Sequence, residues 1–154
     1  MRKATIILGL ALGVAMTAAV AVVVVGSRTK AEAISAPRVI KFVAIRTSFT
    51  SVPAKVAGPV GDEAIVTERL VWQGKQIGHD FVKCTTMTKR FDFQCHTTYV
   101  LDGGMITIQG MVSPPFKHWA SAVTGGTGVY QNVRGELLVT PQQHGTYEEF
   151  HLIP

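Results

Sequence analysis

The 154-residue sequence lacks the motifs of several common enzyme classes. It contains no nucleotide-binding fingerprint, no Ser-His-Asp context and, after residue 33, no stretch of helical periodicity. No two histidines are spaced i,i+2 or i,i+4, the spacings that place a metal-binding pair on one face of a strand or helix. The sequence therefore predicts an all-β domain with neither metal nor cofactor. The five histidines are His79, His96, His118, His144 and His151.

Charged residues are missing from residues 4–26, a run dominated by Ile, Leu, Val and Ala and flanked by basic residues. A small-residue site ending at Ala33 follows, as in a secretory signal. A run of about 20 apolar residues is also long enough to cross a bilayer. We therefore expect residues 1–33 to be a signal peptide or a membrane anchor, and residues 34–154 to be the folded domain. A buried core helix is the less favoured alternative, because a helix that is apolar on every face rarely begins a small domain.

This N-terminal segment also carries most of the positive charge. The full sequence has a net charge of +5, whereas the 11 basic and 9 acidic residues from Ile34 onward leave only +2. Lysine and arginine do not cluster with aromatic residues in the predicted domain, so we expect no nucleic-acid partner. The expected location is outside the cytoplasm, either secreted or anchored to the outer face of the cytoplasmic membrane. If the apolar segment is not cleaved, the membrane is a partner through residues 4–26.

Cysteine is scarce, with only Cys84 and Cys95 present. An exported domain meets an oxidising compartment, in which a cysteine pair tends to close. If residues 88–91 form a hairpin turn, the two cysteines lie opposite each other on adjacent antiparallel strands, within reach of a disulfide. A reactive thiol or a metal site is the alternative. His96 does not favour a metal, because neighbours in a strand point to opposite faces.

Apolar and polar residues alternate with period two from Arg38 to the C-terminus, and turn residues interrupt the alternation. Seven or eight short strands separated by such turns are typical of a sandwich or a closed barrel. The predicted strands cover residues 38–49, 63–72, 77–87, 91–101, 105–111, 121–123, 133–140 and 146–153.

A glycine-rich run, AVTGGTGVYQNVRGEL, occupies residues 122–137. A phosphate cradle is one interpretation of such a run, but it would need a helix N-terminus and the Lys and Ser/Thr of a phosphate loop. Neither is present. We therefore expect these glycines to lie between two strands, where they permit positive φ and let one strand pass close to another.

Several segments, taken in order, resemble the allene oxide cyclase barrel, a fold shared with plant dirigent proteins. They are an Asp-Gly-Gly turn, the strand MITIQG, the run TGGTGVY, then RGEL and the final EEFHLIP, while GDEAIVTERLVWQGKQIGHDFVKCTTM fits upstream. The resemblance covers residues 40–153. It implies an eight-stranded antiparallel β-barrel around a cavity for an apolar ligand, in which catalysis proceeds mainly by proximity and orientation.

The same resemblance argues against the allene oxide reaction itself. The strand glutamate that acts on the substrate in the plant cyclases is replaced by Ala44, with Arg46 nearby. A tyrosine expected after the QG pair is also missing from the region of Met111 and Val112. The cavity cysteine of the cyclases corresponds to Cys84. Related bacterial barrels that fold linear polyenes for ring closure, including Diels–Alder closure, remain a model for the reaction.

The strand over residues 63–72 supplies the predicted site. One of its faces is largely apolar, so we expect that face to point into the barrel. Glu68 would then be a carboxyl group among apolar neighbours, with a raised pKa that suits a general acid. A one-residue register slip would turn Glu68 to solvent instead. The predicted ligand-binding residues are Val66, Leu70, Trp72 and Tyr99, with Glu68 as the catalytic group and polar anchor.

Two functions fit this sequence. The first is a cyclase or isomerase that guides ring closure of a small apolar, polyketide or lipid-like molecule. The second is a non-catalytic carrier for a lipid-like ligand, and a structural protein of the cell envelope is a third, less specific interpretation. The sequence favours an enzyme over a carrier only through the resemblance, and it leaves homo-oligomer formation open.

Overall fold

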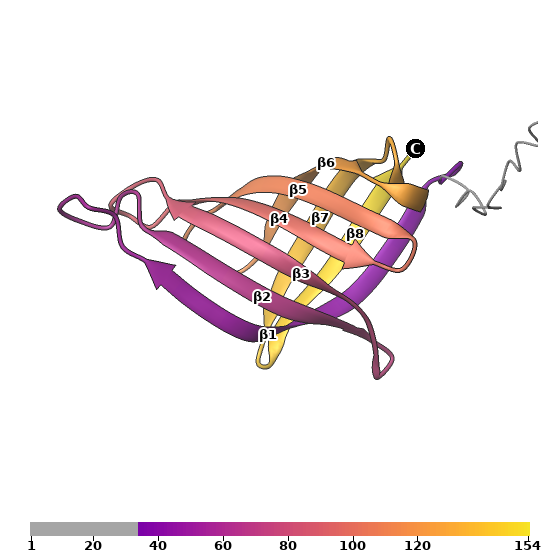
Figure 1. Ribbon diagram of the computed structural model, residues 1–154, viewed down its shortest axis with the longest axis horizontal. Coiled ribbons are helices and arrows are strands. Elements are labelled where there is room, and N and C mark those ends of the chain that lie inside the picture. Colours follow the sequence, from indigo (N-terminus) through magenta and orange to yellow (C-terminus); the bar gives the residue numbers. More distant parts are fainter. Residues whose placement is uncertain (1–33) are drawn as a thin grey trace, which may run out of the picture.

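The computed structural model describes residues 34–154, which form a closed barrel of eight antiparallel strands in the order β1 to β8 (Figure 1). This confirms the fold predicted from the sequence. The predicted signal or anchor segment, residues 1–33, lies outside the described residues. Within the described part, no helix is both long and apolar enough to cross a membrane. The strands are β1 (Arg38–Val52), β2 (Glu63–Trp72), β3 (Lys75–Thr86), β4 (Phe93–Leu101), β5 (Gly104–Val112), β6 (Trp119–Gly126), β7 (Arg134–Gln142) and β8 (Gly145–Ile153).

Each strand pairs with the next along the chain, and β8 pairs with β1 to close the sheet. Closure removes the free edges that an open sheet would expose to other chains. Loops 53–62, 87–92 and 113–118 and the short turn 143–144 lie at one end of the barrel, which we call the open end. The turns 73–74 and 102–103 and the segment 127–133 lie at the other, the closed end.

The alternation of side chains along the strands produces the interior. On β8, for example, Glu148, Phe150 and Leu152 are buried, while Glu149 and His151 between them face outward. The largest fully buried side chains gather toward the closed end and form one continuous apolar core. They include Phe42, Leu70, Ile106, Val133, Leu137, Phe150 and Leu152.

The glycine-rich run shapes the closed end. Gly125 and Gly126 are the last residues of β6, and Gly128 begins a short 3-10 turn, Gly128–Tyr130, with φ of +63°. A Cβ atom on Gly126 or Gly128 would collide with the backbone of a neighbouring segment, so only glycine allows this close approach. The predicted role is confirmed, but two of the glycines belong to a strand rather than to the link between strands. The strand is longer than predicted because a register shift after Thr107 lets Gly125 and Gly126 pair with β5.

Candidate functional site

A cavity of about 440 Å³ occupies the half of the barrel interior nearest the open end. Its volume lies in the range of small-molecule sites in proteins. Most wall positions carry apolar or small side chains. The wall consists of Arg46, Ala64, Val66, Glu68, Val82, Cys84, Phe93, Cys95, Thr97, Tyr99, Ile108, Val112, Phe116, Trp119, Ser121, Leu137, Val139, Thr146 and Glu148.

An aromatic cluster closes the cavity toward the core. The rings of Phe42, Tyr99 and Phe150 contact one another, and Tyr99 meets Phe150 edge to face with centroids 4.9 Å apart. Such pairs stabilise a core beyond simple area burial. The floor of the cavity is therefore rigid, and the Tyr99 hydroxyl is held at a fixed position beneath any ligand.

Acidic residues stand above this floor on adjacent strands. The pairing register places Arg46 of β1 opposite Glu68 of β2, Glu68 opposite Asp80 of β3, and Asp80 opposite Tyr99 of β4. Because directly opposed residues share one face of a sheet, these four side chains form a row along the inner wall. Arg46, at the open end, is the one cation of the row.

Glu148 accepts two side-chain hydrogen bonds in the interior. Its side chain is only 4% exposed, and the Tyr99 hydroxyl donates to Oε2 at 2.8 Å while the Thr146 hydroxyl donates to Oε1 at 2.9 Å. Burial raises the pKa of Glu148 to about 7, and the nearby Glu68 adds to this, although the two hydrogen bonds act in the opposite direction. A carboxyl group with a pKa near neutrality can accept and return a proton at physiological pH.

Asp80 is fully buried, and neither of its oxygens forms a hydrogen bond within the described residues. Burial, followed by the charges of Glu68 and Glu148, raises the pKa of Asp80 to about 9. At neutral pH it is therefore a protonated acid, which lies beside Glu68 and does not itself line the cavity. The pKa of Glu68 is also raised by burial, while Arg46 opposes the shift.

The sequence-predicted site residues divide between the cavity and its surroundings. Val66, Glu68 and Tyr99 line the cavity. Their binding and catalytic roles remain predictions. Leu70 points inward as expected, but it is fully buried in the core beneath the cavity and does not line it.

The placement of Trp72 in the cavity is wrong. This residue ends β2 at the closed end, is 39% exposed, and borders a separate hollow on the outside of the barrel. The strand register shifts between Leu70 and Val71, so the inward alternation of β2 ends before Trp72. The tryptophan in the cavity is Trp119, at the start of β6.

Asp80 and Glu148 were missed by reasoning from the sequence. The signal that could have found them is the same alternation that identified Glu68. Asp80 shares a face with Val82 and Cys84, which line the cavity, and Glu148 shares one with buried Phe150.

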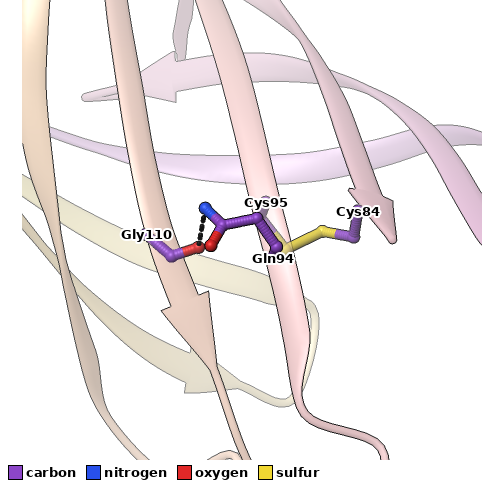
Figure 2. The surroundings of a disulfide bond; sticks show 4 residues. All are labelled: Cys84, Gln94, Cys95 and Gly110. Carbon is purple, nitrogen blue, oxygen red and sulfur yellow. Dashed lines mark hydrogen bonds between the residues drawn. A yellow bond between two sulfur atoms is a disulfide. The ribbon is translucent and has the colours of Figure 1, made fainter. Parts of the chain in front are cut away.

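Cys84 and Cys95 form a disulfide between directly opposed positions of β3 and β4, as predicted from the hairpin (Figure 2). Both residues line the cavity. Beside them, the Gln94 side-chain amide donates to the Gly110 carbonyl oxygen of β5 at 3.2 Å, which links three strands at this point. The disulfide therefore fixes the cavity wall near the open end.

Comparison with solved structures returns the same barrel repeatedly. A pyocyanin demethylase shares 26% identity with a TM-score of 0.68, and the match covers 75% of this chain and 100% of that one. A pterocarpan synthase dirigent protein shares 15% identity over 75% of this chain and 85% of its own, with a TM-score of 0.62. A Diels–Alderase from Streptomyces koyangensis also shares 15%, over 76% of this chain and 69% of its own, with a TM-score of 0.56. At this identity the last two show the fold alone.

Among curated protein sequences, none matches the chain. A family model does: the one described as an allene oxide cyclase barrel like domain matches residues 43–152, most of the described barrel. The match spans the segments on which the sequence resemblance rests. The chain therefore belongs to the allene oxide cyclase barrel-like family.

Proposed function

We propose that this protein is an enzyme that moves protons on a small, largely apolar molecule during ring closure or isomerisation. The observation that carries the proposal is the pair of acids, Glu68 and Glu148, on the wall of an apolar cavity, with Asp80 buried behind them. Burying carboxyl groups is unfavourable unless they are compensated, and Asp80 receives no hydrogen bond within the described residues. A carrier for a lipid-like ligand would need only the apolar wall, so the acids favour catalysis.

The two deepest acids suit opposite roles. Glu148 accepts hydrogen bonds from Tyr99 and Thr146, which hold its carboxylate in place as a base. Asp80 retains its proton at neutral pH but lies behind the cavity wall, so it would supply that proton through its neighbour Glu68, which lines the cavity. Acids with unlike pKa values in one connected group can remove a proton at one atom of the ligand and, through the acid that lines the cavity, supply one at another. The net result is an isomerised or cyclised product, with no gain or loss of electrons.

The apolar wall provides the remaining part of catalysis. It holds a flexible substrate in one conformation. The entropic cost of reaching that conformation is then met on binding and no longer adds to the barrier of ring closure. The names of the structural neighbours support a small-molecule substrate, since they include a demethylase and a Diels–Alderase. Glu68, close to Arg46 at the open end, would orient a polar group of the substrate.

The variant Glu148→Gln tests the proposal, and Glu149→Gln is its matched control. Glu149 is the next residue along β8, but it faces outward, where it pairs with Lys41. Wild-type protein in deuterated water should exchange or rearrange a bound ligand, and Glu148→Gln should lower that rate by about 10²-fold or more. Pyocyanin and linear polyenes are suitable first ligands, and Trp119 fluorescence reports their binding.

Two results would contradict the proposal. One is equal turnover by Glu148→Gln and Glu149→Gln. The other is tight binding of ligands across such a panel with no chemical change in any of them, which would identify a carrier instead.

The proposal also places the protein outside the cytoplasm. The apolar N-terminal segment and the disulfide both support export. Fractionation of the native cells should find the barrel outside the cytoplasm, secreted or attached to the membrane. Recovery from the cytoplasm with both cysteines reduced would overturn this part of the proposal.

A further inference from the structure

The loops of the open end carry an unusual set of exposed side chains. We define the rim as loops 53–62, 87–92 and 113–118 together with Val52, which ends β1. Two of these connections, β1–β2 and β3–β4, project from one end of the barrel in Figure 1. Large apolar side chains of the rim are exposed to solvent, where they have no partner from the described residues to cover them. They are Val52, Val56, Val60, Met87, Phe91 and Phe116.

The rim is also basic. Its four cations are Lys55, Lys89, Arg90 and Lys117, and none of them takes part in a salt bridge among the described residues. Its two acids are held by local hydrogen bonds. Asp62 accepts from the backbone of Ala54, and Asp92 accepts from the side chain of Thr88. The hydrogen bond from Thr88 and the nearby charge of Arg90 both lower the pKa of Asp92, and with four cations and two acids the rim keeps a net charge of +2.

The connections at the closed end are different. The turns 73–74 and 102–103 and the segment 127–133 carry no exposed large apolar side chain in the described structure, although the strand-end residues Trp72, Met105 and Ile153 beside them are exposed. Their residues are mainly glycine, asparagine, glutamine and threonine, with one aspartate. The apolar and basic loop tips therefore belong to the end of the barrel at which the cavity opens.

Aromatic side chains connect the rim to the cavity. Phe93 lies between Phe91 and Phe116, with ring centroids 6.5 Å and 6.0 Å away. Phe93 and Phe116 both line the cavity, while Phe91 stands on the rim. An apolar molecule can thus pass from a surface in contact with the rim into the cavity along continuous apolar contacts.

We propose that the rim docks on an anionic lipid bilayer and that the cavity exchanges its ligand with that bilayer. Apolar loop tips flanked by lysine and arginine match the two layers of such a surface, because the tips enter the acyl boundary and the cations meet the headgroups. A protein partner fits less well, since lysine is depleted at protein interfaces. The proposal concerns binding and does not depend on the acid–base function.

The two tryptophans of the chain allow the orientation to be measured. Trp119 directly follows loop 113–118 at the open end, and Trp72 directly precedes turn 73–74 at the closed end. The full chain carrying Trp72→Phe reports from Trp119 alone, and the full chain carrying Trp119→Phe reports from Trp72 alone. Vesicles of brominated phosphatidylglycerol quench tryptophans that lie near the bilayer.

We expect strong quenching of Trp119 and little quenching of Trp72. Comparing the two reporters also separates docking by the rim from attachment through residues 1–33, since β1 begins at the closed end. Attachment through that segment alone would bring Trp72 nearer to the lipid. Quenching of Trp72 equal to or stronger than that of Trp119 would overturn the proposal, as would the absence of quenching from both.

Paired variants sharpen the test. Phe91 on the rim and Phe81 on the outer wall of β3 are exposed to the same degree, 50% and 52%. Phe91→Ser should abolish most Trp119 quenching, whereas Phe81→Ser should leave it unchanged. Replacing Lys89 and Lys117 with Gln should weaken the effect about fivefold per cation on anionic vesicles. Equal effects of the two phenylalanine variants, or equal quenching by zwitterionic vesicles, would contradict docking on an anionic bilayer.

Discussion

The two halves of the barrel interior differ in packing, although the same eight strands form both. Toward the closed end, large side chains such as Phe42, Leu70 and Phe150 are fully buried and pack together as a core. Toward the open end, the same alternation presents Ala64, Thr97 and other small or polar residues, and a cavity remains. One half therefore supplies stability, and the other leaves room for a ligand beside the acids. The floor formed by Tyr99 and its aromatic neighbours is the boundary between them.

The difference between the halves predicts unequal responses to truncation. Phe150→Ala should lower the free energy of unfolding by about 3–5 kcal/mol, because it opens a void in a packed core. Val66→Ala should cost about 1 kcal/mol or less, since Val66 already faces the cavity. Urea unfolding of the two variants measures both values. Equal losses would mean that the interior is packed uniformly and that the cavity collapses in solution.

Sequence patterns predicted the strands and the packed core better than they predicted the cavity and its acids. Period-two alternation and turn residues were sufficient for the barrel and for the bounds of β2, and they paired Cys84 with Cys95. The inward face of β2 was also identified, apart from Trp72. That error arose at a register shift, which depends on pairing with β3 and leaves no mark on the alternation of β2 alone.

The acid cluster could not be predicted as a unit because its members come from strands far apart in the sequence. Glu68, Asp80 and Glu148 each occupy an inward position of their own strand, but only closure of the barrel brings β8 next to β1 and completes the wall. The hydrogen bond from Tyr99 to Glu148 spans 49 residues. Such long-range pairing is set by the tertiary fold, which local patterns do not encode.

A second prediction concerns how the acids affect stability. Because the pKa of Asp80 is raised to about 9 in the folded state, the folded protein holds this proton more tightly than the unfolded chain does. The protonated Asp80 therefore contributes its full stabilisation below the unfolded-state pKa of about 4. This stabilisation is lost as the pH rises toward 9. Asp80→Asn removes this loss and should stabilise the fold by on the order of 2 kcal/mol at pH 8, with less effect at pH 5.

Asp102→Asn is the matched control, because Asp102 is exposed in a turn at the closed end. Thermal unfolding from pH 5 to pH 9 should show a flatter profile for Asp80→Asn than for wild type, and no difference for Asp102→Asn. A profile for Asp80→Asn that falls as steeply as that of wild type would show that Asp80 is ionised in the folded protein at neutral pH.

The central claim is that the barrel interior beside the cavity holds a protonated carboxyl group, Asp80, at neutral pH, and infrared spectroscopy of the folded protein tests it most directly. The carbonyl stretch of a protonated acid is distinct from the bands of a carboxylate. We predict two components of this band in wild type and in Asp102→Asn, one from Glu148 that titrates near pH 7 and one that titrates only near pH 9; Asp80→Asn should remove the second. A wild-type spectrum at pH 7 without any protonated carboxyl band would contradict the account.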